Sequence, residues 1–200
     1  MQVVVLAGRL LLLLTAAGHT VFAGTHKEHA DLTVPTLAVS LTDDLPTMQA
    51  ALAGHDLDAV FQVAGSRGQN LLQVDAYGAV KLAQAAEALG IERYIMLSSF
   101  NATEPSLWPD TLGDYYIAKF FADEWLINQT KLNYTIVQPG SLTEEPGTGK
   151  ITLNPAKAAN NSIDNVAAVL VATLNEPKTY RQVFTMTDGE QPIKQALQSL

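Results

Sequence analysis

Apolar and polar positions divide the chain into two kinds of segment that alternate. Short apolar runs, typical of strands buried on both faces, are QVVVLA (2–7), HTVFAG (19–24), DAVFQV (58–63), RYIMLSS (93–99), NYTIVQPG (133–140) and RQVFTMT (181–187). Segments typical of helices lie between them, at 9–17, 42–54, 74–90, 114–129, 162–177 and 192–200. Gly18, Gly54 and Gly90 stand where three of these helices would end.

This alternation predicts an α/β fold with a doubly wound parallel sheet and helices on both faces. No internal repeat or low-complexity linker interrupts it, so residues 1–200 are expected to form a single domain. Ligands of such folds bind beyond the carboxyl ends of the strands. The places to look for a site are therefore 7–8, 24–27, 64–66, 98–99 and 139–141.

Composition narrows the classes of partner. Hydrophobic residues make up 48% of the chain and charged residues 16%, which is typical of globular proteins. The net charge of -8 argues against nucleic acids and anionic membranes as partners, and no apolar run approaches the about 20 residues of a membrane span. The absence of cysteine excludes disulfides and thiolate chemistry and fits a cytoplasmic protein. A small-molecule substrate is expected, and nothing indicates the oligomeric state.

The sharpest chemical pattern combines Ser98 and Ser99 at a strand end with Tyr115 and Lys119, which are four residues apart on a predicted helix. That spacing puts the phenol and the ammonium on one face. A nearby ammonium favours the ionised form of a phenol, so such a tyrosine can pass a proton to or from a carbonyl or alcohol oxygen. A serine hydroxyl can stabilise the developing charge. Tyr116, three residues before the lysine, is the competing tyrosine.

Four segments carry a resemblance to a known family: DAYGAVKLAQAAEALGIERYIMLSS, YYIAKFFADEWL, LNYTIVQPGSLTEEPGTGKI and SIDNVAAVLVATLNEPKTYRQVFTMTDGEQPIKQAL. They resemble the atypical short-chain dehydrogenase/reductases, and among these the small bacterial NAD(P)-binding oxidoreductases related to NmrA-like proteins. The resemblance covers nearly the whole chain, and PGSLTEEPGTGK is its most specific part. It implies a Rossmann fold with a dinucleotide lying across the strand ends.

The resemblance also implies roles for single residues. Ser99 would be the catalytic serine, in preference to Ser98, with Tyr115 as proton donor and Lys119 as its partner and a ribose contact. Further contacts with the cofactor are implied beside the ribose at Ala64, Gly65 and Ser66, and beside the nicotinamide at Pro139, Gly140 and Ser141.

One expected feature is missing. Members of the family follow their first strand with a glycine-rich turn whose backbone amides approach the pyrophosphate. Here Gly8 is followed directly by Arg9 and a run of leucines, and the unit is shorter than the about 30 residues that strand–helix–strand units usually take. Either the protein lacks the turn and binds dinucleotide weakly or not at all, or residues of a mobile loop are absent from the sequence at this point. Gly8 and Arg9 remain the candidates for this contact.

The residues after the second predicted strand bear on the choice of cofactor. An acid there selects NAD, whereas basic residues accommodate the 2′-phosphate of NADP. His26 and Lys27 favour NADP, with NAD as the alternative. The histidines have no metal-like spacing, so no metal is expected.

The sequence therefore predicts a cytoplasmic NAD(P)-dependent oxidoreductase that transfers hydride to or from a small carbonyl or alcohol. Loops near 100–114 and 141–162 would form a small substrate-side region. A rival reading is a redox sensor of the NmrA type, which binds NADP without turnover. Epimerase or dehydratase chemistry on a nucleotide sugar is less favoured, because about 200 residues leave little room for the substrate subdomain of those enzymes.

Overall fold

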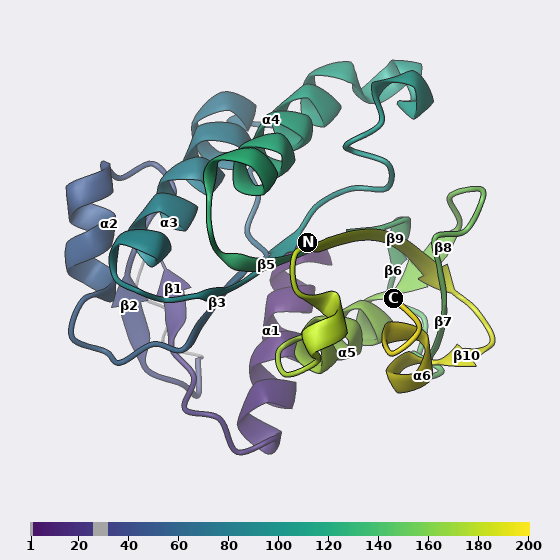
Figure 1. Ribbon diagram of the computed structural model, residues 1–200, viewed down its shortest axis with the longest axis horizontal. Coiled ribbons are helices and arrows are strands. Elements are labelled where there is room, and N and C mark those ends of the chain that lie inside the picture. The colour runs from purple at the N-terminus through teal and green to yellow at the C-terminus, as the bar shows by residue number, and fades with distance from the viewer. Residues whose placement is uncertain (1, 26–31) are drawn as a thin grey trace.

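The structure is a computed structural model that describes the backbone of residues 2–25 and 32–200, and the side chains of residues 6–25 and 32–200. Its centre is a six-stranded sheet in the order β10-β7-β9-β5-β4-β3 (Figure 1). The parallel strands are β3 (Ala59–Gln62), β4 (Arg93–Leu97), β5 (Asn133–Pro139) and β9 (Gln182–Asp188). Two antiparallel strands, β7 (Lys150–Leu153) and β10 (Gln191–Pro192), extend the sheet beyond β9.

Helices cover both faces of this sheet (Figure 1). One face carries α2 (Leu45–Leu52), α3 (Tyr77–Ala88) and α4 (Gly113–Gln129). The other carries α1 (Gln2–Ala16), α5 (Ile163–Thr173) and α6 (Ile193–Leu197). A hydrophobic core lies on each face of the sheet, and successive strand residues point into opposite cores. Tyr94 packs with α2–α4 and Ile95 with α1, α5 and α6. The doubly wound α/β class and the single domain predicted from the pattern are confirmed.

Several short elements complete the chain. Two parallel pairs stand apart from the main sheet, β1 (Ala23–Thr25) with β2 (Thr36–Ala38) and β6 (Ser141–Thr143) with β8 (Asn160–Ser162). A π-helical segment, η1 (Leu71–Ala76), leads directly into α3. Three 3₁₀ turns are η2 (Pro105–Leu107), η3 (Asp110–Leu112) and η4 (Pro177–Thr179).

The expected strand at residues 2–7 is wrong. Residues 2–16 form one continuous helix, which packs along α5. Leu6, Leu10 and Leu14 recur every fourth residue and are almost fully buried in the core on that side. Because no residues are available for a turn between a strand and the leucine-rich helix, the helical pattern extends back to Gln2, although valine is a weak helix former.

Because residues 2–16 are helical, β1 and β2 are not joined to the six-stranded sheet. In the part of the chain that the structure describes, no strand pairs with the outer edge of β3, and β1 with β2 forms a separate two-stranded sheet. A parallel sheet wound in the expected way would have its first strand at that edge.

Among the described residues, no helix is both long and apolar enough to cross a membrane.

Candidate active site

The two serines that follow β4 point to different partners. Ser98 is buried, and its Oγ donates a 2.7 Å hydrogen bond to Oδ2 of Asp123. Ser99 is half-buried, and its Oγ donates a 2.7 Å hydrogen bond to the phenol oxygen of Tyr115. Successive residues of an extended segment face opposite sides, which explains the division. Only Ser99 therefore has its hydroxyl beside the tyrosine.

Lys119 lies one helical turn beyond Tyr115 on α4, as the spacing predicts. Its Nζ lies 5.8 Å from the centroid of the Tyr115 ring, and its side chain is 9% exposed. Nζ also lies 3.5 Å from the carbonyl oxygen of Leu97 and 3.9 Å from Oδ1 of Asp75. The structure thus brings Ser99, Tyr115 and Lys119 together at the carboxyl end of β4.

The competing tyrosine is turned away from this group. Tyr116 is 8% exposed, and its ring packs 5.8 Å from that of Trp108. Burial, with a smaller contribution from Tyr115, raises the pKa of the Tyr116 phenol above its ordinary value. This tyrosine therefore serves the packing of α4 against the loop that precedes it.

Two buried carboxylates beside the site were not singled out from the sequence. Asp123 is completely buried, accepts from Ser98 and from Nε2 of Gln138 at 3.0 Å, and has no partner for its Oδ1 among the described residues. Burial raises the pKa of Asp123 to about 6, although the two hydrogen bonds and the charge of Lys119 oppose this. The sequence did contain an indication that Asp123 lies near the site, since Tyr115, Lys119 and Asp123 follow one another at intervals of four residues on one helix.

Asp75 is the second of these carboxylates. It lies in η1 and is 2% exposed, and its Oδ2 accepts from the backbone N–H of Ser66 at 3.0 Å. A Cβ at Gly65 would lie 2.8 Å from Oδ1 of this carboxylate, closer than side chains approach. The loop after β3 is thereby held against η1, with Gly65 and Ser66 partly buried and Ala64 exposed.

Pro139, Gly140 and Ser141 connect β5 to β6. The N–H of Gly140 donates to Oδ1 of Asn161 at 2.7 Å, and a Cβ at Gly140 would lie 2.0 Å from the carbonyl oxygen of Ala159. The glycine is thus required by close contact with the segment before β8. Pro139 is buried and Ser141 is exposed at the strand end.

The residues expected near the pyrophosphate are not arranged as a phosphate turn. Gly8 lies inside α1, and a Cβ there would meet nothing within 4 Å. The guanidinium of Arg9 lies 3.0 Å from a carboxylate oxygen of Asp164, the acid in the first turn of α5. His26 and Lys27 lie outside the described residues.

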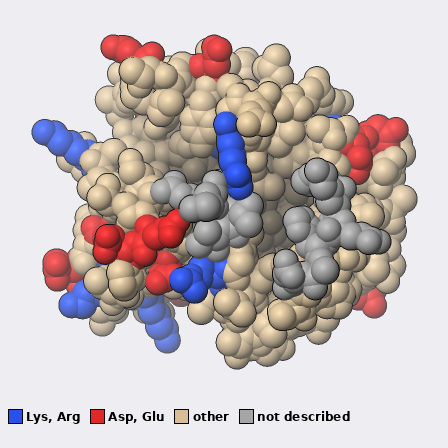
Figure 2. All heavy atoms as spheres, turned by 180° about the vertical axis from the view of Figure 1, so that it is seen from behind, with Lys and Arg blue, Asp and Glu red and all other residues tan. Residues whose placement is uncertain are grey.

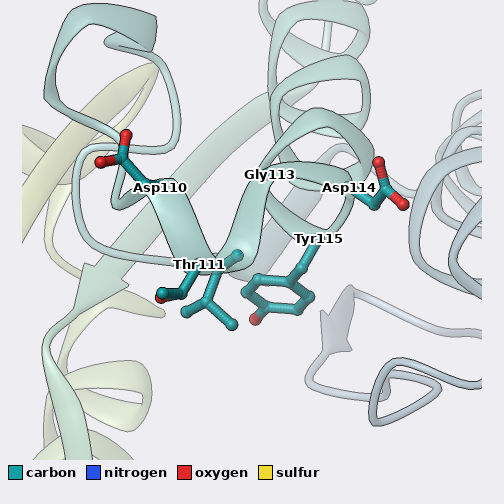
Figure 3. A pocket seen from close by; sticks show the side chains of 6 residues that line it. Asp110, Thr111, Gly113, Asp114 and Tyr115 are labelled. Atoms are coloured by element: carbon teal, nitrogen blue, oxygen red, sulfur yellow. The ribbon is translucent and has the colours of Figure 1, made fainter.

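A shallow pocket of about 410 Å³ adjoins Tyr115. Its lining consists of Asp110, Thr111, Leu112, Gly113, Asp114 and Tyr115. Thr111 and Tyr115 point to the same side, whereas the carboxylates of Asp110 and Asp114 point away from them (Figure 3). The pocket therefore offers a hydroxyl, a phenol and the apolar Leu112 to a bound molecule, and its lining includes no cationic side chain.

Trp108 fixes the loop that carries this pocket. Its indole N–H lies within hydrogen-bonding distance of the carbonyl oxygens of Asn101 and Ala102, at 3.2 and 3.1 Å, and its ring packs on Phe120 as well as Tyr116. Among the large apolar residues of this loop, Leu112 lines the pocket, Leu107 is 60% exposed and Trp108 anchors the loop by these contacts.

The face seen in Figure 2 carries several acidic side chains close together at its left, with no comparable group of basic side chains. Lys and Arg side chains stand singly or beside acids there, and the described residues of that face form no continuous basic surface. Among the described residues, no group of three or more His, Cys, Asp or Glu side chains could hold a metal ion.

The described residues fit the ribose and nicotinamide of a dinucleotide but not its pyrophosphate. Gly65 and Ser66, the serine–tyrosine–lysine group and Ser141 lie at the strand ends where a ribose and a nicotinamide would be held. The glycine cradle that would receive the pyrophosphate is absent from the described residues, because Gly8 is helical and Arg9 is paired with Asp164.

Comparison with known proteins gives the family. Residues 6–177 match the model of a family described as NAD(P)H-binding. The protein called "Uncharacterized sugar epimerase YhfK" of Bacillus subtilis is 39% identical over 159 residues, which cover 76% of this chain and 73% of that protein. The yeast UPF0659 protein YMR090W, of Saccharomyces cerevisiae, is 33% identical over 175 residues, covering 80% of this chain and 77% of the relative.

A solved structure agrees with these relatives. The oxidoreductase ylbE from Lactococcus lactis superposes with a TM-score of 0.91 at 38% identity, covering 98% of this chain and 91% of the other. The match extends through the strand ends at which the serine, tyrosine and lysine meet. The chain belongs to the NAD(P)H-binding protein family.

Proposed function

We propose that this protein is an NADP-dependent oxidoreductase of the atypical short-chain dehydrogenase/reductase type, acting on a small neutral carbonyl compound or alcohol. The observation that carries the proposal is the 2.7 Å hydrogen bond between Ser99 and Tyr115, with Lys119 one helical turn away. Bound NADPH supplies the hydride, and the residues of this chain handle the proton.

The chemistry follows from the positions of the hydroxyl groups. In a reduction, the phenol of Tyr115 donates its proton to the carbonyl oxygen as the carbon gains hydride, so that the product is an alcohol. The hydroxyl of Ser99 donates a hydrogen bond to the same oxygen while negative charge builds there. The ammonium of Lys119 stabilises the phenolate left on Tyr115 until solvent returns the proton. In the reverse direction the phenolate accepts the proton of the alcohol.

The pocket beside Tyr115 supports a neutral substrate. Its lining offers Thr111, Leu112 and the tyrosine ring, and no cation in it would hold a carboxylate or phosphate group. A nucleotide sugar carries a diphosphate that needs such groups. The sugar-epimerase reaction in the name of the Bacillus relative is therefore the less favoured chemistry for this chain.

A second candidate is a redox sensor that binds dinucleotide and acts on a protein partner without turnover. The continuous helix through Gly8 favours it, because a weakened pyrophosphate site suits a protein that responds to changes in dinucleotide concentration.

The test begins with calorimetric titration of the protein with NADPH and, in parallel, NADH. The basic residues His26 and Lys27 lead us to expect tighter binding of NADPH. Oxidation of NADPH is then followed with diacetyl, menadione and para-nitrobenzaldehyde for the wild type and for Tyr115→Phe. Loss of turnover with retained binding in Tyr115→Phe supports the enzyme, and turnover that survives this change contradicts it.

A matched control removes a phenol elsewhere. Tyr180→Phe takes the hydroxyl from a ring that stacks on Arg93, where η4 ends and shortly before β9 begins. It is expected to bind and turn over as the wild type does. If the wild type binds NADPH and reduces none of the three carbonyls, the sensor becomes the better proposal.

A further inference from the structure

The buried carboxylate of Asp75 faces two parts of the site at once. One oxygen, Oδ2, accepts the N–H of Ser66, at the strand end where the ribose of the cofactor is expected. The other, Oδ1, lies 3.9 Å from Nζ of Lys119, with both side chains withdrawn from solvent. We propose that Asp75 is a positioning residue that holds Lys119 as a charged ammonium toward Tyr115 and fixes the Gly65–Ser66 backbone beside the cofactor. This inference rests on the proposed function.

The surroundings of Asp75 hold it in place. The N–H of Tyr77 closes the π-helical turn of η1 on the carbonyl oxygen of Leu72. A Cβ at Gly78, three residues after Asp75, would lie 2.7 Å from the carbonyl oxygen of Leu41 and 2.9 Å from that of Gln73. This glycine therefore lets the start of α3 pack directly on neighbouring backbone. A π-helical turn is uncommon and is frequent at functional sites.

The lysine needs such a partner. The side chain of Lys119 is 9% exposed, and a buried ammonium without a counter-ion is strongly disfavoured. The groups that face it are Asp75 from η1, Asp123 and Tyr115 from its own helix, and the carbonyl oxygen of Leu97 from β4. Asp123 also keeps one oxygen without a hydrogen bond, but among the described carboxylates only Asp75 has an oxygen within 4 Å of the ammonium nitrogen.

Gly65 is in close contact with the same carboxylate. Because its Cβ would lie 2.8 Å from Oδ1, any side chain there would displace the oxygen that faces Lys119. Gly65 is thus explained by the carboxylate rather than by a special backbone conformation.

The test separates charge from shape. Asp75→Asn keeps an oxygen for the N–H of Ser66 and removes the charge opposite Lys119, while Asp58→Asn makes the same change at an exposed position as the control. With NADPH and the three carbonyls, Asp75→Asn is expected to lower turnover about 10- to 100-fold, as misplacement of a catalytic group does. Its dissociation constant for NADPH should stay within about threefold of the wild type.

A measurement without cofactor keeps the pairing testable by itself. The urea midpoints of the wild type, Asp75→Asn, Lys119→Met and the double variant form a cycle. We expect a smaller downward shift from Asp75→Asn in the Lys119→Met background than in the wild type. Equal shifts overturn the pairing, and a wild-type turnover in Asp75→Asn, or a loss of turnover matched by an equal loss of NADPH affinity, overturns the positioning role. If the wild type reduces none of the carbonyls, the proposed function fails while the cycle still decides whether Asp75 and Lys119 are coupled.

Discussion

The hydroxyl of Ser99 donates a 2.7 Å hydrogen bond to the phenol oxygen of Tyr115, across the gap between the end of β4 and the first turn of α4. Its neighbour Ser98 donates instead to the buried Asp123. Two adjacent serines of identical chemistry therefore have different consequences when they are removed.

Replacing each serine by alanine should separate activity from stability. Ser99→Ala is expected to lower turnover of a reducible carbonyl by about 10²-fold, the usual effect of losing one oxyanion donor, with little change in unfolding. Ser98→Ala should destabilise the fold by about 1–3 kcal/mol, because the carboxylate of Asp123 loses one of its two hydrogen bonds. Steady-state kinetics and urea unfolding of both variants check this. Equal kinetic effects would contradict the division of roles.

Asp123 predicts a dependence of stability on pH. Its pKa is about 6 in the folded protein against an ordinary value of 3.8, so the folded state holds the proton more tightly than the unfolded state. The contribution of this group to stability is therefore fully present at acid pH and is lost as pH rises from about 4 to about 6. The size of the effect is on the order of 3 kcal/mol, from about 1.4 kcal/mol for each pH unit of difference.

Asp123→Asn provides the comparison, because asparagine is nearly the same shape and does not titrate in this range. Urea unfolding of both proteins at pH values from about 4 to about 7 should show the stability difference changing in favour of the variant as pH rises. Parallel curves for the two proteins would show that Asp123 titrates normally.

Arg93 joins β4 to its surroundings at the end of the sheet opposite the site. Its buried guanidinium donates to the carbonyl oxygens of Asn133 and Thr173, at 2.5 and 2.6 Å, and to Oγ1 of Thr135 at 2.7 Å. Burial lowers the pKa of Arg93 to about 10, so it remains charged at neutral pH. Arg93→Met should destabilise the fold by about 3 kcal/mol because several acceptors lose their donor, while affinity for NADPH stays unchanged. Thermal unfolding and calorimetry measure the two effects, and a loss of affinity without a loss of stability would contradict this role.

The fold could be predicted where the local pattern of apolar residues is strong. The long apolar runs of β3, β4, β5 and β9, and the helices between them, were all predicted from the sequence. The short polar strand β8 and the antiparallel β7 were not, because each pairs with a strand that is not its neighbour in the sequence and neither has a marked apolar pattern. At residues 2–7 the valine-rich run indicates a strand by its composition, and the spacing of Leu6, Leu10 and Leu14 extends the helix through it.

The site shows the same limit. That Tyr115 and Lys119 lie together could be predicted because four residues on one helix is a local relationship, and Ser99 was a candidate because it follows a strand. Asp75 approaches Lys119 only through the packing of η1 on α4, more than forty positions along the chain. A buried acid just before a helix carries no chemical signature until its partner is known.

Gly8 provides the most direct test of the N-terminal helix. It lies in the interior of α1 with open space where a Cβ would stand, so Gly8→Ala should stabilise the protein by up to about 1 kcal/mol through better helix propensity. Gly140→Ala is the contrasting change, because its Cβ would lie 2.0 Å from the carbonyl oxygen of Ala159, and it should destabilise. Urea unfolding and NADPH titration of both variants test whether residues 2–7 are helical or form a strand beside the cofactor. A stabilised Gly8→Ala with unchanged affinity is expected of the helix. A Gly8→Ala that folds normally and no longer binds NADPH would mean that this glycine lies against the pyrophosphate, and that residues 2–7 form a strand when the cofactor is bound.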